Sequence, residues 1–274
     1  MVKDPKLYES NGKLIYRSDF VRALKKLGIK KGDVVFVHSS LGVFGKPPSF
    51  ERSWILENLI DVLKESVGKE GTLIVPTFSY SFCKGEVYDK DKTLSTIGIL
   101  PEFFRNLPDV VRTNHPIFSV GIWGKNKDYY LDISKDSFGK NSIFGKLHKN
   151  NAKLILFGAP FESSTFNYYV EQSYGIPYRY MKTFKGKIRK KGIEYEDKCT
   201  YFVKYLNKNV VADKKRFENH LRKKGLINDV KVGNGNILMV ELKKWYEEGF
   251  KVLNKDIFFF LKEKPNLKNI KIIK

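Results

Sequence analysis

Four short segments of the chain place small polar or turn-forming residues directly after an apolar or extended stretch. They are residues 37–41, 75–79, 114–119 and 157–160. In an open α/β sheet, ligands bind beyond the carboxyl ends of the strands, because loops and helix N-termini converge there. Hydroxyls and exposed backbone N–H groups at such ends suit a phosphate or a thioester oxygen. One such segment is more typical of a helix N-cap than of a ligand site, but four together predict a single polar cleft.

The elements that would position this cleft alternate between amphipathic helices and buried strands. Phe20, Leu24 and Leu27 fall on one face of a helix predicted over residues 17–28, because their spacings are four and three. A second helix is expected at residues 54–66. Short apolar runs predict strands buried on both faces of a sheet, at residues 34–37, 72–75 and 154–157. This order predicts an α/β fold, namely an αβα sandwich with a mostly parallel central sheet.

Beyond about residue 180 the pattern changes to short alternating stretches rich in Lys and Arg. Residues 181–231 hold 16 basic and 6 acidic side chains, which predicts a smaller, basic β-rich lobe with a charged helix at 213–224. An apolar strand at 237–240 and a last helix follow. We therefore divide the chain into an α/β core, 1–180, this basic lobe, and a C-terminal strand and helix that return to the core, 232–274.

Five ordered motifs give the chain a resemblance to the aminoglycoside 3-N-acetyltransferase family. They are Gly32–Leu41, Gly71–Ser79, Gly98–Arg105, Val111–Ser119 and Asn141–Leu147. Order and spacing agree from about residue 12 to 180, and more loosely from Gly233 to the C-terminus. The resemblance implies an αβα sandwich unlike the commoner GNAT fold, binding of an acyl-CoA, and direct transfer of its acyl group to an amine.

The same resemblance implies which residues bind acetyl-CoA or a longer acyl-CoA. Hydroxyls of the first two motifs would hold the coenzyme A arm and the thioester end, and Arg112 or the basic lobe would meet the phosphates, where charge-assisted hydrogen bonds are strongest. The full set is His38, Ser39, Ser40, Thr77, Ser79, Arg112, Ser119, Ser142 and Gly145. No metal is expected as a cofactor.

One position departs from the family. After the third predicted strand the family reads Thr-x-x-His-x-x-Glu, and its His and Glu are assigned to activating the amine. Here Thr165 and Glu171 are kept, but Tyr168 occupies the histidine position. An imidazole with a pKa near 6.5 accepts a proton at neutral pH, whereas a phenol with a pKa near 10 is already protonated. The usual base is therefore missing from its usual place.

Three explanations for this departure stay open. His115 could supply the base or orient Glu171, although it could equally be a structural residue before a rigid proline. Tyr168 or Asn167 could donate to the departing thiolate or to the thioester oxygen while water removes the amine proton; Tyr168 could also be an aromatic that packs against the substrate. In the third explanation the chain only binds its ligands. The catalytic candidates are therefore Glu171, Tyr168, His115 and Asn167.

The charge of the chain bears on the amine. Among 274 residues, 51 Lys and Arg stand against 30 Asp and Glu, a net charge of +21. Such a surface attracts anions and repels polycations. We therefore expect the acceptor to be the amine of a nucleotide-linked amino (dideoxy) sugar used in surface polysaccharide synthesis. The alternative is acetylation of an aminoglycoside antibiotic, which would confer resistance.

A nucleic-acid-binding protein is a more remote hypothesis. The basic lobe interleaves aromatic residues with Lys and Arg, as single-strand binders do. These aromatics are Tyr180, Phe184, Tyr195, Tyr201, Phe202 and Tyr205. No recognised nucleic-acid motif occurs there, and the same alternation describes a half-buried strand.

The remaining composition is that of a cytoplasmic protein. No run of about 18 apolar residues occurs, and the N-terminal segment Met1–Lys6 lacks the apolar core of a signal peptide. Cys83 and Cys199 are far apart in the chain and have no metal-ligand spacing, so free thiols are expected. We expect no membrane span, and we leave open whether the protein forms a homo-oligomer.

Overall fold

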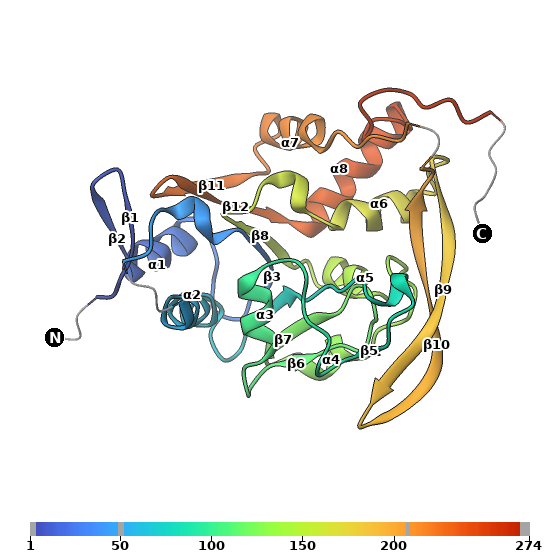
Figure 1. Cartoon of the computed structure of the whole chain (residues 1–274). Coiled ribbons are helices and arrows are strands. Elements are labelled where there is room, and N and C mark those ends of the chain that lie inside the picture. Colours follow the sequence, from blue (N-terminus) through green and yellow to red (C-terminus); the bar gives the residue numbers. More distant parts are fainter. Residues whose placement is uncertain (1–3, 49–51, 207–208, 269–274) are drawn as a thin grey trace.

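The computed structural model describes residues 4–48, 52–206 and 209–268 (Figure 1). At its centre is a seven-stranded sheet with the strand order β11-β12-β8-β3-β4-β7-β6. The strands are β3 (Val34–Ser39), β4 (Thr72–Pro76), β6 (Val111–Arg112), β7 (Val120–Gly124), β8 (Lys153–Phe157), β11 (Asn228–Val232) and β12 (Gly235–Glu241). The predicted strands at 34–37, 72–75, 154–157 and 237–240 all lie in this sheet.

Parallel pairing is confined to the three central strands of the sheet. β3 pairs in parallel with both β4 and β8. β7 and β12 run antiparallel to β4 and β8 and are followed outward by antiparallel β6 and β11. The α/β sandwich is confirmed, and the carboxyl ends of β3, β4 and β8 meet at one edge of the sheet.

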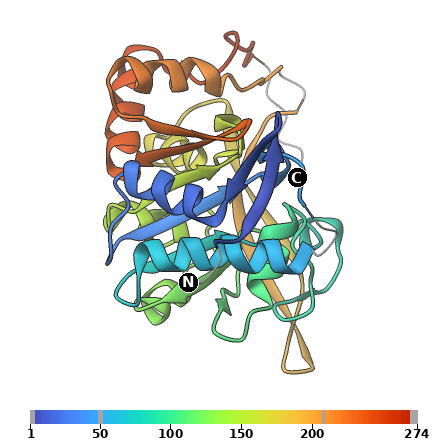
Figure 2. The same cartoon turned by 90° about the vertical axis from the view of Figure 1, so that its left-hand side faces the viewer.

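One face of the sheet is covered by α1 (Arg17–Lys26), α2 (Arg52–Val67) and α3 (Ile99–Arg105). In α1 the buried side chains are Phe20, Ala23 and Leu24, the face that the spacing predicts. They pack in one core with Ile155 and Phe157 of β8. Figure 2 views this layer from outside, with α1 and α2 in blue in front of the sheet.

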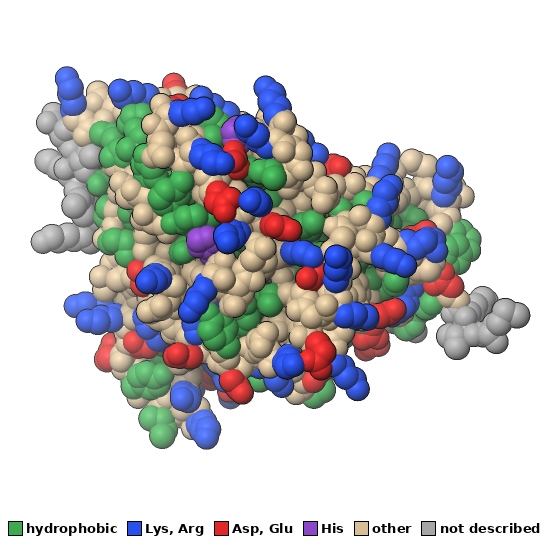
Figure 3. All heavy atoms as spheres, turned by 180° about the vertical axis from the view of Figure 1, so that it is seen from behind, with side chains coloured by type: hydrophobic (Ala, Val, Ile, Leu, Met, Phe, Trp, Pro, Cys, Tyr) green, Lys and Arg blue, Asp and Glu red, His purple; other side chains and the backbone are tan. Residues whose placement is uncertain are grey.

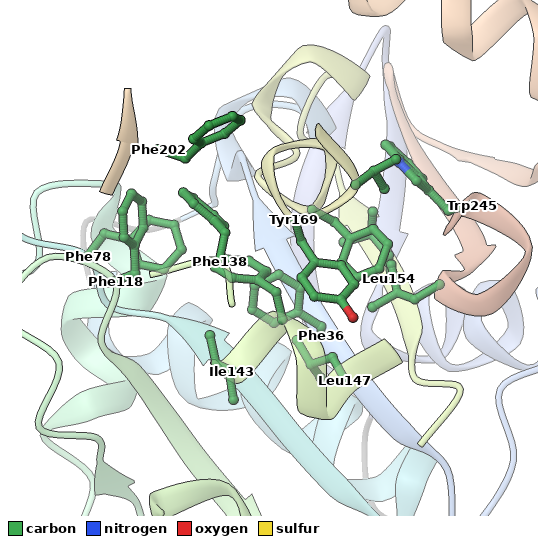
Figure 4. Packing of buried hydrophobic residues seen from close by; sticks show 14 of the residues in the cluster. Phe36, Phe78, Phe118, Phe138, Ile143, Leu147, Leu154, Tyr169, Phe202 and Trp245 are labelled. Atoms are coloured by element: carbon green, nitrogen blue, oxygen red, sulfur yellow. The ribbon is translucent and has the colours of Figure 1, made fainter. Parts of the chain in front are cut away.

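The opposite face is covered by α4 (Lys127–Leu131), α5 (Ile143–Lys149), α6 (Phe166–Tyr174), α7 (Lys214–Lys223) and α8 (Leu242–Lys255). Their apolar side chains form a second core with Leu154 and Leu156, the alternate residues of β8. This core is rich in aromatics; Figure 4 shows Phe36, Phe138 and Trp245 within it. Because β8 is apolar on both of its faces, it is buried between the two helical layers.

A long hairpin stands at the side of the sandwich (Figure 1). It consists of β9 (Arg179–Lys190) and β10 (Ile193–Lys204), and β9 also pairs with the short β5 (Tyr88–Asp89). A smaller hairpin joins β1 (Lys6–Ser10) and β2 (Lys13–Tyr16). Three short 3-10 helices complete the description, η1 (Leu41–Phe44), η2 (Phe82–Lys84) and η3 (Phe161–Ser163).

The predicted basic lobe, 181–231, is β-rich only as far as the end of this hairpin. The charged helix expected at 213–224 is α7, which belongs to the helical layer with α8, and β11 joins the main sheet. Residues 207–208 of the predicted lobe lie outside the described residues, as do residues 1–3 of the N-terminal segment. Within the described ranges, no helix has the length and apolar character needed to cross a membrane.

Candidate active site

A cavity of about 190 Å³ lies at the carboxyl ends of the central strands. β3 contributes His38 and Ser39, and the segment from the end of β4 onward contributes Pro76 and Phe78. The remaining lining residues are Tyr80, Ile97, Pro101, Ala159, Ser163 and Thr165. Three of the four polar segments expected from the sequence therefore meet at one cavity, as parallel pairing of β3 with β4 and β8 requires.

The fourth segment, residues 114–119, supports the cavity from behind. The backbone N–H groups of Thr77 and Ser79 donate to the carbonyls of Ser119 and Ile117. The side chains of Thr77, Ser79 and Ser119 are buried. These contacts hold the segment that follows β4 in place, so that Phe78 and Tyr80 reach the cavity wall.

His38 is the titratable side chain of β3 that lines the cavity. It is 7% exposed, and its ring lies edge-on to Phe36 and Phe78. Its Nε2 lies 3.5 Å from Oγ1 of Thr165, at the long limit of a hydrogen bond. Burial, and to a smaller extent the charge of Lys214, lowers the pKa of His38 to about 3. The imidazole is therefore neutral at physiological pH.

Glu171 lies on α6, whose N-cap residue Thr165 lines this cavity, and its side chain is buried in the interior. The hydroxyl of Tyr178 donates to its Oε1 at 2.9 Å. Its Oε2 lies 3.0 Å from Nε of Arg179, and both side chains are almost fully buried. Burial lowers the pKa of Arg179, but the carboxylate of Glu171 and the neighbouring tyrosines together raise it, so the net direction is upward. The two groups form an ion pair in the interior, although Oε2 and Nε are not aligned for a hydrogen bond.

Tyr168 shares α6 with Glu171, one turn earlier. The guanidinium carbon of Arg179 lies 4.5 Å and Nζ of Lys214 lies 4.8 Å from the centre of its ring. Phe138 contacts the ring edge-on at 5.5 Å. The position that holds a histidine in the family is thus occupied by an aromatic ring contacted by two cations, a favourable arrangement for a π face.

A second cavity, of about 360 Å³, adjoins Tyr168 on the hairpin side. Its wall combines aromatic rings with basic side chains, and Arg179, Lys182 and Lys204 supply the positive charge. Several of the aromatic residues considered above for binding nucleic acid line this cavity or pack beside it. Tyr180 stacks on Tyr205 at 4.8 Å, and Phe202 is buried. Their rings pack against one another rather than forming an open stacking surface.

His115, the candidate replacement base, lies in the interior of the protein. Its Nδ1 accepts the backbone N–H groups of Ile117 and Phe118, which places the ring proton on Nε2, 3.3 Å from Oγ of Ser137. Burial lowers the pKa of His115 to about 3, and Lys135 adds to this. Both nitrogens are occupied by protein groups, and the partners of Glu171 are Tyr178 and Arg179. The geometry favours the structural explanation for His115.

Arg112 is likewise committed to the protein. Its Nε donates to the hydroxyls of Thr77 and Ser119, and its terminal nitrogens donate to the carbonyls of Thr77, Lys90 and Thr93. All three nitrogens of the guanidinium therefore have acceptors within the chain. Arg112 therefore joins β6 to the segment after β4, and its guanidinium has no nitrogen left free to bind a phosphate.

The remaining predicted residues differ in whether they reach the cavity. Ser39 lines the cavity, whereas Ser40 follows at the start of η1, with its N–H bonded to the carbonyl of Phe157. Asn167 points into the core, where its Oδ1 accepts the indole N–H of Trp245 at 3.4 Å. The geometry does not bring Asn167 to either cavity.

Ser142 and Gly145 belong to the turn that starts α5. The Ser142 hydroxyl is the N-cap and accepts the N–H of Gly145 at 3.2 Å. A Cβ at Gly145 would collide with the carbonyl oxygen of Lys140, which accounts for glycine there. Gly145 lines a larger surface cavity on the α5–α6 side, and neither residue lines the cavity at the strand ends.

Sequence reasoning missed the groups that surround Tyr168 and Glu171. Tyr178 and Arg179 follow α6 directly but belong to no motif, and Lys214 comes from α7. Its Nζ donates to the carbonyls of Glu162 and Ser164. The available signal was the helical spacing of Lys214 with the apolar Phe217 and Leu221, but only the tertiary contacts place it beside Tyr168.

The fold is that of solved aminoglycoside acetyltransferases. The chain belongs to the aminoglycoside 3-N-acetyltransferase family, whose sequence model matches residues 36–254. The expectation of a family of acyl-CoA-dependent N-acyltransferases is confirmed.

Individual relatives agree with this assignment. The chain is 34% identical over 180 residues to the SPbeta prophage-derived aminoglycoside N(3')-acetyltransferase-like protein YokD of Bacillus subtilis, an alignment covering 57% of this chain and 64% of that protein. Among solved structures, aminoglycoside acetyltransferase AAC(3)-IVa superposes with a TM-score of 0.75 at 20% identity, covering 96% of this chain and 94% of that one. The structure of AAC-IIIb with CoASH gives a TM-score of 0.75 at 20% identity over 91% and 98%. At such identity these structures establish the shared fold.

The expected nucleotide-linked amino sugar acceptor is wrong. The family and its named members are aminoglycoside acetyltransferases, and none of those named here is described as acting on a nucleotide sugar. Net charge is a sum over the whole surface and does not identify what one cavity binds. On the face shown in Figure 3, Lys and Arg are scattered and mixed with Asp and Glu rather than gathered at one site.

Proposed function

We propose that this protein transfers an acetyl group from acetyl-CoA directly to an amine of an aminoglycoside. The observation that carries the proposal is the small cavity at the carboxyl ends of β3, β4 and β8, beside α6 with its buried Glu171, in a chain of this family. In the transfer, the amine nitrogen attacks the thioester carbonyl carbon, the carbon–sulfur bond breaks, and coenzyme A leaves as its thiol. Because acetyl-CoA is an intracellular metabolite, the proposal places the reaction in the cytoplasm.

The cavity supports a short acyl group at its inner end. At about 190 Å³ it is lined by the rings of Phe78 and Tyr80 and by hydroxyls of Ser39 and Thr165. The apolar rings suit a methyl group, and the hydroxyls can hydrogen-bond the thioester oxygen as charge develops on it. A longer acyl chain would need room that these rings occupy, so acetyl-CoA is the preferred donor in this proposal.

The path of the coenzyme A arm is suggested by a neighbouring surface cavity. Ile97 and Pro101 line the strand-end cavity, while Thr96, Gly98 and Ile99 line the next one, of about 650 Å³. The two share the segment that enters α3. We place the pantetheine arm across this segment, with the nucleotide end in the larger cavity, where Arg52 supplies a positive charge.

The acceptor is placed in the cavity beside Tyr168. This cavity and the strand-end cavity lie on either side of the start of α6, since Thr165 lines one and Tyr168 lines the other. An amine bound there would approach the thioester from the hairpin side. Catalysis would rest mainly on holding amine and thioester in contact, which can supply about 7–11 kcal/mol of the barrier.

Thiol release tests the proposal. Purified protein is incubated with acetyl-CoA and a panel of kanamycin-type and gentamicin-type aminoglycosides, and free coenzyme A is measured with a thiol reagent while the product is weighed by mass spectrometry. The expected result is one thiol released per acetyl group added to the aminoglycoside. Thiol release without an acetylated product, or no release with any aminoglycoside, would refute the assignment. Butyryl-CoA serves as the matched donor and should react at least tenfold more slowly.

A further inference from the structure

Only one of the four histidines of the chain borders the strand-end cavity. All four lie within the described residues. His115 is enclosed by backbone and by Ser137, His148 stacks on Tyr246 at 4.0 Å on another face, and His220 pairs with Glu248 at 2.8 Å. His38 alone combines a cavity-facing position with a ring nitrogen that has no closer partner than a hydroxyl at 3.5 Å.

The pleat of β3 directs His38 toward the helical layer that contains α6. Phe36 and His38 are alternate residues of the strand, and Phe36 packs in the core on the α6 side. The imidazole thus reaches Thr165, the residue that immediately precedes α6. In the family motif Thr165 stands three residues before the histidine position, so His38 approaches the same end of α6 from the sheet.

Lys214 joins the surroundings of His38 and Tyr168. Its Nζ is fixed by the carbonyls of Glu162 and Ser164 and lies 4.8 Å from the ring centre of Tyr168. Its positive charge and burial both lower the pKa of His38, so the resting ring is neutral and, once protonated, gives the proton up readily. A neutral imidazole has a lone pair free to accept a proton.

The alternatives near this point are unsuited to accept a proton. The carboxylate of Glu171 is held by Arg179 at 3.0 Å and Tyr178 at 2.9 Å. The ring of Tyr168 is contacted by two cations, Arg179 and Lys214, and a phenol is a proton donor rather than an acceptor in such a step. Another group must therefore accept the amine proton.

We propose that His38 is the general base of the acetyl transfer, taking over the part of the histidine that Tyr168 replaces. The inference rests on the proposed function. As the amine nitrogen bonds to the carbonyl carbon, its N–H bond breaks and the proton passes to Nε2 of His38, which releases its long contact with Thr165. The carbon–sulfur bond then breaks, and the imidazolium returns the proton to the departing thiolate sulfur, so that amide and free thiol form and His38 is neutral again.

The first experiment compares His38→Gln with His148→Gln, a matched loss of an imidazole outside the cavity. Thiol release gives kcat with acetyl-CoA and the best aminoglycoside, calorimetry gives the dissociation constant of coenzyme A, and thermal unfolding reports folding. We expect His38→Gln to lose about 10²- to 10⁴-fold in kcat. Its affinity for coenzyme A should stay within about twofold, as should every parameter of His148→Gln.

Chemical rescue separates a base from a residue that only shapes the cavity. His38→Ala leaves a space at the end of β3, and added imidazole should raise its kcat at least tenfold without affecting His148→Ala. A fall in kcat matched by an equal fall in coenzyme A affinity, with no rescue, would overturn the proposal. So would a His38→Gln variant that keeps a third of the wild-type kcat.

Two further outcomes are decisive. If the His38 variants do not fold, the wild-type protein is treated with diethyl pyrocarbonate and the labelled histidines are mapped by mass spectrometry. Loss of thiol release in step with labelling of His38, reversed by hydroxylamine, supports the proposal, and full turnover by protein labelled at His38 contradicts it. If wild-type protein releases no thiol with any acceptor, the proposed function fails and the base assigned to it fails with it. Turnover by the wild type that survives in His38→Gln overturns the base alone.

Discussion

The carboxylate of Glu171 and the guanidinium of Arg179 lie 3.0 Å apart, with side chains 2% and 6% exposed. Glu171 is on α6, and Arg179 is the first residue of β9. The pair therefore joins the helix that carries the family motif to the hairpin that walls the second cavity. Because its oxygens contact Arg179 and Tyr178, the carboxylate of Glu171 positions the elements of the site and is unsuited to act as a base.

Breaking this pair should destabilise the protein strongly. Arg179→Gln leaves the Glu171 charge buried with only Tyr178 as partner, and we expect a loss of about 3–5 kcal/mol in the free energy of unfolding. Glu171→Gln should cost a similar amount, while the double variant should cost clearly less than the sum, because neither charge is then left alone. Urea unfolding of the three variants measures this coupling. Additive losses would show that the two side chains do not interact.

Arg112→Lys distinguishes a structural clamp from a phosphate ligand. The lysine keeps the charge but loses the fork that reaches Thr77, Lys90 and Thr93, so we expect unfolding to become easier by about 2–4 kcal/mol. The dissociation constant of coenzyme A, measured well below the melting temperature, should change less than about threefold. Unchanged stability with a tenfold weaker, salt-sensitive affinity would instead make Arg112 a phosphate ligand.

Substitutions of Tyr168 separate its ring from its hydroxyl. Tyr168→Phe keeps the π face that meets Arg179 and Lys214, and we expect stability and kcat to stay close to wild type. Tyr168→Ala removes the ring and should cost about 2–4 kcal/mol through lost packing and cation–π contacts. A hundredfold loss of kcat in Tyr168→Phe would assign the hydroxyl a part in the chemistry.

Two buried histidines predict acid sensitivity of the fold. The pKa values of His38 and His115 are lowered from 6.5 to about 3, mainly by burial. Between these values the unfolded chain binds protons that the native protein does not, so stability is full above pH 6.5 and falls as the pH is lowered toward 3. Each histidine should contribute up to about 1.4 kcal/mol per pH unit.

This dependence is measured from urea midpoints between pH 7 and pH 5, where few carboxylates titrate. His115→Gln should lower the slope by about one proton, because it removes a group that binds a proton only in the unfolded chain at these pH values. A flat stability profile across this interval would show that His38 and His115 become protonated within the native state.

The positive charge of the second cavity, where we place the acceptor, should lower kcat/KM for polycationic aminoglycosides. Lys182 lines this cavity, and Lys185, on the same strand, points to the opposite, exposed side. Both Lys182→Glu and Lys185→Glu change the net charge equally, so their difference reports position. We expect Lys182→Glu to raise kcat/KM for a polycationic aminoglycoside about three- to tenfold at low salt, with the gain shrinking at high salt. Equal effects of the two variants would mean that only the net charge matters.

Much of the fold could be predicted because its signals are local. The apolar runs at 34–37, 72–75 and 154–157 are strands in the structure, and the spacing of Phe20 and Leu24 identified the buried face of α1. The weaker signals were misassigned or missed. β6, of two residues, is too short to carry a pattern, and β7 was missed because Gly121 and Gly124 interrupt its apolar run.

The sequence by itself determined the family, the strand-end position of His38 and Ser39, and the replacement of a histidine by Tyr168. Only the tertiary structure decided which polar groups are free. Arg112 and His115 occur in the same motifs as the cavity residues. Their polar atoms, however, already form hydrogen bonds with Thr77, Thr93, Ile117 and Phe118. Whether a donor is free depends on partners far away in the chain and on burial, and neither is a property of local sequence. For the same reason the charge composition could not identify the acceptor.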